Sequence, residues 1–465
     1  MNKKIFFLFF FAFAIRLIAL NQSLWLDEAV TANVVKNFDL GQIISKFSPT
    51  DFHPPLYYLM MKLWTNLFGY SEVALRFPSI IFSLLTGYFI YKIASLLAPR
   101  SPKGEVGFFS VIFFLFNPLI VYYSQEARMY MMATFFLTGG LYYFFKSQKL
   151  EVKSQKYNSK VKSLMLMNLF FTLAFLSFYG SVFLIAAVNL YFLFKKDYKA
   201  FILNTLYFIL VVLLISPLLS HQLINSKIAL TNVANWSATL GKANIKNLLL
   251  IPIKFSIGRI SFYPKWFYWG ITGTWTGFVL FTIKTVLNKT VFIKTVFYLL
   301  IFPLFLGFVV SFITPMLQYF RFLYLIPIVC LLLGFGLSGQ AKFNLGGYVL
   351  AGGFVIFSLV YLLLPQFHRE DWKNLVSNLP KDKPVYMIMA SSDPITYYNN
   401  NLIVRELTLL RQGFGGQGGF EKEIVVIPYA AEIYGFNYKD SLIKSGYKLK
   451  KETSFREVTY EEWIK

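Results

Sequence analysis

Long apolar runs recur along most of the chain, and they constrain its fold more than any other feature. Charged residues make up only 14% of the 465 residues and hydrophobic residues 56%, whereas a soluble domain carries about 25% charge. This composition excludes a soluble enzyme, a disordered protein and a fibrous protein. The first apolar run lies within residues 1–20, and ten more of spanning length follow at about 77–98, 106–121, 129–145, 164–178, 181–194, 200–219, 266–286, 295–313, 322–337 and 345–364. We predict an all-α polytopic membrane protein with about 11 transmembrane helices.

The N-terminal segment carries two lysines before its apolar run, as a signal peptide also does. Arg16 lies inside the run and no small-x-small cleavage site follows it. We therefore predict an uncleaved first helix with its N-terminus in the cytoplasm. The stretches 164–178 and 181–194 are treated as two spans divided near Tyr179 and Gly180, because a single helix there would be too long.

The distribution of lysine and arginine predicts which loops face the cytoplasm. A net charge of +23 would suggest a nucleic-acid partner in a soluble protein, but cations in cytoplasmic loops set membrane topology, and we expect no nucleic acid. If the 13-residue apolar segment 56–68 is an interfacial helix, the lysine-rich loop 146–163 is cytoplasmic; if it spans, that loop moves outside. The first arrangement agrees with the charge rule. It places 21–76, 122–128, 220–265, 314–321 and the tail after 365 on the outer face of the cell membrane.

The tail, residues 366–465, is polar, unlike the preceding residues 1–365. Short β-like runs lie at Val385–Ala390, Leu402–Leu407 and Ile424–Pro428, and a helix is expected at Asp440–Ser445. We predict a small extracytoplasmic α/β domain. The tract 411–419 contains G-x-G-x-x-G, but a strand rather than a helix follows it, so we interpret it as a linker and not as a dinucleotide site. The single cysteine, Cys330, excludes an intrachain disulfide and a cysteine metal cluster.

Acidic residues and histidines close to the membrane are costly and therefore suggest function. Asp27 and Glu28 follow the first span in LWLDEA (24–29); on a helix their side chains point about 100° apart, so only one faces a shared cavity. The functional interpretation is that one of them is a general base. The alternative is that they are ordinary solvated carboxylates or a helix cap. His53, in DFHPPLYY (51–58), binds a phosphate or hydroxyl group, or simply belongs to a turn.

Two further outer segments combine aromatic and charged side chains. In YYSQEARMY (122–130), Glu126 and Arg128 either pair with each other or position a base and a phosphate. Arg321, in QYFRFLY (318–324), either snorkels or clamps a phosphate. The outer loop 220–265 carries six cations and no acid, which indicates an anionic partner or lipid headgroups.

Taken in order, the boxes WLDEA, HPPLYY, RFPS (76–79) and YSQEARMY (123–130) resemble the GT-C membrane glycosyltransferases, in the branch of bacterial aminoarabinose transferase and the protein O-mannosyltransferases. They cover residues 20–130, and the hydropathy pattern extends the likeness to about 365. The resemblance implies transfer of one sugar from a polyprenyl-phosphate carrier to a lipid, glycan or protein acceptor on the outer face. It implies that Asp27 and Glu126 are catalytic. It also implies Arg128, Lys62 and Arg321 as candidates for the donor phosphate, with Glu28 in a supporting role.

In this interpretation Asp27 takes a proton from the acceptor, and cations stabilise the departing lipid phosphate. Stacking on the sugar is expected from the aromatic side chains of Trp25, Tyr57, Tyr122 and Tyr123. No cofactor is firmly implied and no ligand cluster demands a metal, although Asp27 and Glu126 could share a divalent ion.

Two other functions remain open at this stage. A polytopic transporter or flippase of lipid-linked sugars would place acids near the middle of its spans, whereas the informative charges here lie at the outer ends of loops. A non-catalytic assembly subunit would tolerate Asp27→Asn.

Overall fold

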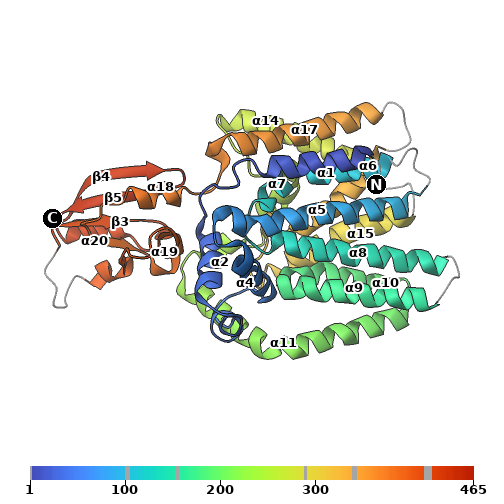
Figure 1. Ribbon diagram of the computed structural model, residues 1–465, viewed down its shortest axis with the longest axis horizontal. Helices are drawn as coiled ribbons and strands as arrows, with labels where there is room; N and C mark the ends of the chain where they lie inside the picture. The colour runs from blue at the N-terminus through green and yellow to red at the C-terminus, as the bar shows by residue number, and fades with distance from the viewer. Residues whose placement is uncertain (1–2, 100–104, 153–156, 287–290, 338–342, 413–420) are drawn as a thin grey trace.

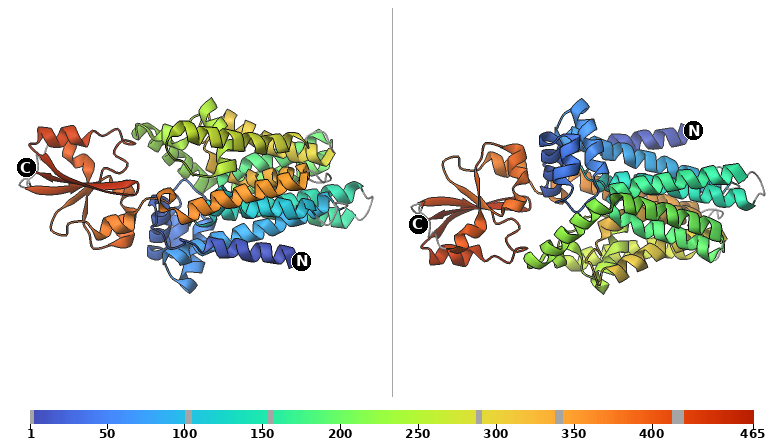
Figure 2. Two further views of the ribbon diagram at one scale, coloured as in Figure 1. Left: turned by 90° about the horizontal axis from the view of Figure 1, so that it is seen from above. Right: turned by 90° about the horizontal axis from the view of Figure 1, so that it is seen from below.

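The computed structural model describes residues 3–99, 105–152, 157–286, 291–337, 343–412 and 421–465. A bundle of helices carries a smaller domain with a β-sheet at one end (Figure 1). The N-terminus lies at the other end of the bundle. Two helices of the segment 21–76, α2 (Leu26–Asn37) and α4 (Leu56–Phe68), lie at the end that faces the small domain (Figure 2).

The bundle is built from apolar helices of unequal length. Six described helical segments are long and apolar enough to cross a membrane, and the bent pair α6 and α7 would be a seventh span. The prediction of a helical multi-span membrane protein is therefore confirmed, with six or seven spans by this criterion. The helices are α1 (Lys3–Arg16), α5 (Glu72–Leu97), α6 (Glu105–Leu115), α7 (Pro118–Ser124), α8 (Tyr130–Val152), α9 (Tyr157–Ser177), α10 (Val182–Phe194), α11 (Tyr198–Asn232), α14 (Lys265–Lys284), α15 (Val291–Val310), α16 (Ile326–Gly336) and α17 (Phe343–Leu363).

The stretch 106–121, expected to be one span, is broken. The helices α6 and α7 meet at an angle of 57°. Pro118 cannot donate a backbone hydrogen bond and suits the first turn of a new helix. The side-chain oxygen of Asn117 accepts hydrogen bonds from the N–H groups of Leu119 and Ile120, which caps α7. This short helix leads directly to the acidic and basic box at 123–130.

The region 220–265 is not the simple loop that hydropathy suggests. Helix α11 runs through to Asn232, and the short helices α12 (Trp236–Leu240) and α13 (Ile245–Ile257) follow. Hydropathy falls after residue 219, which suggested that the helix ends there. Polar residues can continue a helix, and α11 extends past this point to Asn232. The predicted break near Tyr179 is present, as the 3₁₀ turn η3 (Tyr179–Ser181) between α9 and α10.

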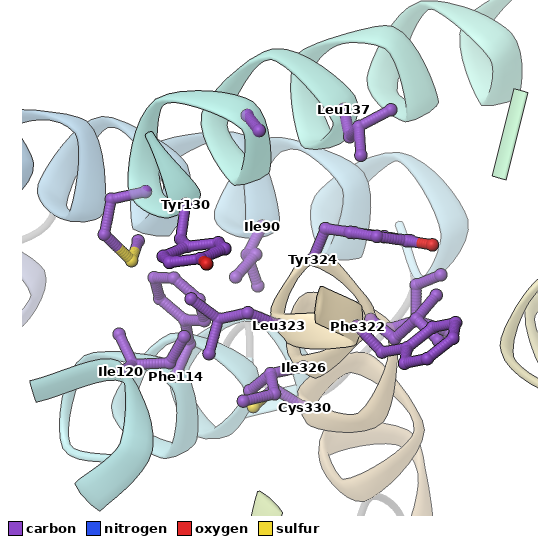
Figure 3. Close-up of a cluster of buried hydrophobic side chains, with 14 of the residues drawn as sticks. Ile90, Phe114, Ile120, Tyr130, Leu137, Phe322, Leu323, Tyr324, Ile326 and Cys330 are labelled. Atoms are coloured by element: carbon purple, nitrogen blue, oxygen red, sulfur yellow. The ribbon is translucent and has the colours of Figure 1, made fainter. Parts of the chain in front are cut away.

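A buried turn supports the end of the bundle that faces the small domain. The 3₁₀ segment η4 (Tyr319–Leu325) precedes α16, and its Phe322, Leu323 and Tyr324 are at most 2% exposed. Figure 3 shows these side chains packed among residues of α5, α6, α7 and α8. The Tyr324 hydroxyl donates to the carbonyl of Gly180 over 3.1 Å. This packing fixes the backbone of the segment that carries Arg321.

The small domain contains one mixed sheet in the order β2-β1-β3-β5-β4. Strand β1 pairs in parallel with β2 and β3, and β5 pairs antiparallel with β3 and β4. From residue 413 on, the glycine-rich tract lies outside the described residues. The strands are β1 (Val385–Met387), β2 (Val404–Glu406), β3 (Glu423–Val426), β4 (Lys448–Phe455) and β5 (Val458–Ile464), and the helices are α18 (Trp372–Ser377), α19 (Asp393–Tyr398) and α20 (Tyr438–Lys444).

The short elements complete the chain. They are α3 (Leu40–Gln42) and the π-turn η1 (Ile43–Phe47) in the first outer loop, η5 (Pro365–Phe367) after α17, and η6 (Met389–Ser391) and η7 (Leu407–Gln412) in the small domain.

Candidate active site

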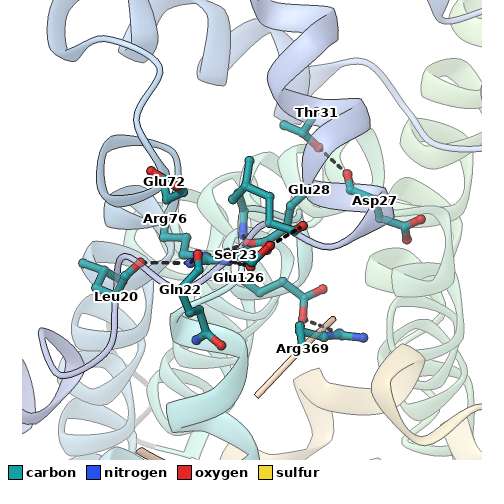
Figure 4. Close-up of polar contacts among 12 residues, drawn as sticks. Leu20, Gln22, Ser23, Asp27, Glu28, Thr31, Glu72, Arg76, Glu126 and Arg369 are labelled. Atoms are coloured by element: carbon teal, nitrogen blue, oxygen red, sulfur yellow. Dashed lines mark hydrogen bonds and ion pairs between the residues drawn. The ribbon is translucent and has the colours of Figure 1, made fainter. Parts of the chain in front are cut away.

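The two adjacent acids of the first outer loop face different surroundings. Both lie in the first turn of α2, where the helix geometry directs successive side chains about 100° apart. The side chain of Asp27 is 36% exposed, while that of Glu28 is 1% exposed. Figure 4 shows the Asp27 carboxylate pointing away from the buried group around Glu28. Only Asp27 is therefore accessible to a substrate.

Glu28 joins three segments of the chain inside the protein. Its two carboxylate oxygens accept hydrogen bonds from Nε and Nη2 of Arg76 at 2.8 and 2.6 Å. Oε1 also accepts from the N–H of Ala127 at 2.7 Å. These bonds occupy both oxygens, so Glu28 holds the first outer loop against α5 and the α7–α8 connection. Glu28 was predicted to play a supporting role among the substrate-binding residues, and that role stays a prediction.

Arg128 connects Asp27 to the HPPLYY segment. Its Nη2 lies 3.3 Å from Oδ2 of Asp27 and 3.5 Å from Nε2 of His53. Its Nη1 lies 3.5 Å from the hydroxyl of Tyr58. The arginine is only 4% exposed, so its charge acts in a poorly hydrated place. The structure thus brings Asp27, Arg128 and His53 into one group.

Asp51 stands behind His53 and belongs to the same group. Its Oδ1 lies 3.4 Å from Nδ1 of His53. Burial alone would raise the pKa of Asp51, but the charges of His53 and Arg128 and the hydrogen bond from His53 outweigh it, and the pKa falls below its usual value. A charged Asp51 would orient the His53 ring through Nδ1.

Glu126 has different partners from Arg128, so the two do not neutralise each other. Nη2 of Arg369, from the segment after α17, lies 2.7 Å from Oε2 of Glu126. The Arg369 guanidinium lies 3.9 Å from the ring centroid of Trp25 and 5.0 Å from that of Tyr122. Burial and the nearby charge of Glu28 raise the pKa of Glu126 well above its usual value.

A second guanidinium lies against Tyr122 from the acid-free outer loop. Arg259 donates to the Tyr122 hydroxyl at 2.5 Å, and its guanidinium carbon is 4.9 Å from the ring centroid. Burial opposes the charge of Arg259, yet Tyr319, Tyr123 and Glu126 raise its pKa above the usual value. Arg259 therefore remains a buried cation near Glu126.

The remaining predicted residues lie at different distances from this group. Arg321 is close enough to Asp27 for their charges to interact, and its Nη1 lies 3.4 Å from the carbonyl of Pro315. Tyr57 and Tyr123 are both buried at 2% exposure. Lys62 is not part of the group, because its ammonium donates to the carbonyl of Val35 at 2.7 Å. That bond holds α4 against the end of α2.

Comparison with known proteins connects this geometry to an enzyme class. Residues 52–223 match the family model of dolichyl-phosphate-mannose-protein mannosyltransferase. This segment contains the HPPLYY, RFPS and YSQEARMY boxes, and with the fold it confirms the resemblance drawn from the sequence. Residues 52–223 therefore resemble a membrane glycosyltransferase of the GT-C type. No curated protein sequence matches it.

Solved structures show the same fold over almost the whole length of the chain. ArnT from Cupriavidus metallidurans in the apo state is 11% identical with a TM-score of 0.64, and the match covers 99% of this chain and 98% of that one. The same protein bound to undecaprenyl phosphate is 12% identical with a TM-score of 0.60 and equal coverage. The Archaeoglobus fulgidus oligosaccharyltransferase in complex with Zn and sulfate is 11% identical with a TM-score of 0.50, covering 91% of this chain and 68% of that one.

Several buried polar atoms around the site of the glycosyltransferase have no hydrogen-bonding partner in the described part of the chain. Native proteins leave few such atoms without a partner, and a cluster of them indicates a ligand-binding place. These atoms are Nε1 of Trp25, Oδ2 of Asp51, the hydroxyl of Tyr57, Oε1 of Glu126, Nε of Arg128 and Nε of Arg369.

The carboxylates of the site do not form a metal-binding set. Among the described residues no group of three or more histidine, cysteine, aspartate or glutamate side chains could hold an ion. Asp27 faces Arg128 and Glu126 faces Arg369, so each carboxylate already has its own cation. The donor set does not fit a divalent ion shared between Asp27 and Glu126.

Sequence reasoning missed four charged members of the glycosyltransferase site. Asp51 and Arg76 lie inside the quoted boxes, but no role was assigned to them. Each is a charged residue next to an apolar helical segment, and this pattern could have identified both. Arg259 was noted only as one cation of the outer loop. Arg369 follows the last span and carries no local pattern that connects it to Glu126.

Proposed function

We propose that the glycosyltransferase transfers a single sugar from a polyprenyl-phosphate donor to an acceptor hydroxyl or amine on the outer face, with Asp27 as the general base. The observation that carries the proposal is the accessible Asp27 carboxylate 3.3 Å from buried Arg128. The family match and the fold shared with a protein bound to undecaprenyl phosphate support it. The acceptor is a lipid, a glycan or a protein.

The chemistry follows from where charge develops during the reaction. Departure of the sugar from a lipid phosphate leaves negative charge on the phosphate, which fixed cations stabilise best in a poorly hydrated site. Arg128 and Arg321 supply that charge near Asp27, and Arg259 supplies it beside Tyr122 and Glu126. Asp27 accepts the acceptor proton as the new glycosidic bond forms and the sugar–phosphate bond breaks. A single displacement of this kind inverts the anomeric carbon.

The proposed topology places this chemistry outside the cell. We propose 11 spans, a cytoplasmic N-terminus, a catalytic membrane domain over residues 1–365 and an extracytoplasmic domain over 366–465. The opposite placement of the N-terminus and the sheet domain along the bundle supports this arrangement (Figure 1). The lysine-rich loop 146–163 then faces the cytoplasm, in agreement with the positive-inside rule.

The test compares two acids of the first outer loop. A host strain that lacks the gene would be complemented with the wild type, Asp27→Asn or Asp39→Asn, and its surface glycolipids and glycoproteins measured by mass spectrometry. Asp39 caps α3, a function that asparagine also performs, so it is a matched control. The wild type and Asp39→Asn should restore the mass of one added sugar. Asp27→Asn should not, at equal amounts of protein in the membrane.

A flippase of lipid-linked sugars would behave differently in the same material. It moves its substrate without forming a covalent product. Purified wild-type protein would then yield no glycosylated acceptor when given the donor and acceptor found by mass spectrometry. Product formation by the wild type but not by Asp27→Asn supports the transferase, and full turnover by Asp27→Asn removes the role of Asp27.

A further inference from the structure

The segment His368–Asp371, which we call the junction, connects the bundle to the small domain and enters the site. It follows α17 and η5 and ends where α18 begins. Arg369 from this segment has a side chain that is 13% exposed, and its partner Glu126 is 3% exposed. Figure 4 shows the Arg369 side chain directed at Glu126 from the side opposite Arg76. A residue of the tail thus reaches a carboxylate of the YSQEARMY box.

The small domain holds the junction by its backbone. Nε of Arg456, in the turn between β4 and β5, donates to the carbonyl of Arg369 at 2.6 Å. The N–H of Asp371 donates to the carbonyl of Arg456 at 3.0 Å. These bonds on either side of residue 370 fix the direction in which the Arg369 side chain leaves the chain. The position of this guanidinium therefore depends on the sheet of the small domain.

The same domain also contacts α2, which carries Asp27. The Tyr398 hydroxyl accepts a hydrogen bond from the N–H of Leu24 at 2.8 Å. The side chain of Asp393 accepts from Nδ2 of Asn33 at 2.8 Å. The docked domain is thus attached to the helix of one acid and, through Arg369, to the other acid of the site.

We propose that Arg369 is a positioning residue through which the small domain orients Glu126 beside the sugar-transfer site and opposes the protonation that burial favours. The role of this site rests on the proposed function, but the charge of Glu126 does not. The hydrogen bond to Arg369 uses Oε2, which leaves Oε1 without a partner among the described residues. An ionised Oε1 accepts a hydrogen bond from a substrate hydroxyl, whereas a protonated carboxyl group would donate one instead.

The surroundings of Glu126 make its charge depend on this contact. Burial and the charges of Glu28 and Asp27 favour the protonated form, while Arg128 and Arg259 favour the ionised form. Arg369 is the cation in direct contact at 2.7 Å. Its guanidinium is fixed between Trp25 and Tyr122, and arginine does not lose its proton in proteins. Loss of such a contact removes a stabilisation that lowers a carboxyl pKa by about 1–3 pH units.

Infrared spectroscopy of the purified full-length protein tests this proposal without any substrate. The C=O stretch of a protonated carboxyl group would be followed against pH in the wild type, Glu126→Gln, Arg369→Gln and the double variant. We expect the Glu126 signal in Arg369→Gln to appear at a pH about 1–3 units higher than in the wild type, and to be absent from the double variant. Lys373→Gln is the control, because the side chain of Lys373 is 54% exposed and pairs with Glu72 next to the junction, away from Glu126.

Two further measurements keep the proposal falsifiable if Arg369→Gln fails to fold. In the wild type minus Glu126→Gln difference spectrum the signal of protonated Glu126 should disappear as the pH rises, and a signal that does not change with pH overturns the proposal. Arg456→Ala should shift the Glu126 titration upwards by a smaller amount, and an unchanged titration overturns the role of the small domain. Neither result bears on whether Asp27 is the general base, so the two proposals can fail separately.

Discussion

Arg76 and Glu28 form a two-armed ion pair that is almost fully enclosed, with each side chain 1% exposed. The remaining donors of Arg76 are also used, by the backbone carbonyls of Leu20, Gln22 and Ser23. The pair therefore determines the path of the chain from α1 into α2. Asp27 owes its position to this neighbour, since a fixed Glu28 turns Asp27 outward.

Glu28→Gln should strongly destabilise the protein. Removing one charge of a buried pair leaves the other uncompensated, which costs about 3–5 kcal/mol. Thermal unfolding in detergent would measure the change, with Lys373→Gln as the control, because an exposed pair contributes about 0–1 kcal/mol. Equal melting temperatures for the two variants would contradict a structural role for Glu28.

Much of the bundle could be predicted from the sequence, because apolar length and proline or glycine positions carry the information. The break near Tyr179 is an example. Strand β4, KLKKETSF, could not be found this way. It is an edge strand whose first five residues are exposed. No alternation of apolar and polar residues therefore marks it in the sequence. The bend before Pro118 was readable from the Asn-Pro pair but was hidden by continuous hydropathy.

The site was predictable where the chemistry is local. Adjacent acids on a helix must point apart, and this alone separates Asp27 from Glu28. Pairing between distant segments was not predictable, because no spacing rule connects residues such as Glu126 and Arg369, which lie 243 positions apart. Lys62 shows the converse error. It has a suitable charge in the correct box, but its ammonium is directed at the carbonyl of Val35.

Gly334→Ala should destabilise the bundle, whereas Gly352→Ala should not. A Cβ at Gly334 in α16 would lie 2.1 Å from Oγ of Ser110 and 2.8 Å from the carbonyl oxygen of Val106, a backbone atom of α6. Overpacking of this kind costs about 1–3 kcal/mol. A Cβ at Gly352 in α17 would meet nothing within 4 Å. The measurement is again thermal unfolding in detergent, and a stable Gly334→Ala protein would show that α6 and α16 pack less closely.

Lys254 should make stability rise with pH. Burial, with the charges of Arg259 and Lys265, lowers its pKa from 10.5 to about 8. Between these values the unfolded chain binds more protons than the folded protein, so the free energy of unfolding increases with pH. The melting temperature of the wild type minus that of Lys254→Met should become more positive from about pH 7 to pH 10. A constant difference would mean that Lys254 is well hydrated.

Arg321→Ala and Lys62→Met should separate a phosphate contact from a structural lysine. Both cations were candidates for the donor phosphate; the charge of Arg321 interacts with that of Asp27, whereas the ammonium of Lys62 is bonded to the carbonyl of Val35. A hydrogen bond to a charged group contributes about 1.5–3 kcal/mol, which corresponds to about 10–100-fold in affinity. Native mass spectrometry with undecaprenyl phosphate as the probe should show that loss for Arg321→Ala and none for folded Lys62→Met. If both variants bind as the wild type does, Arg321 only anchors η4 at the membrane surface. If Lys62→Met alone loses affinity, its ammonium must leave the carbonyl of Val35 to meet the lipid, and the phosphate site lies beside α4.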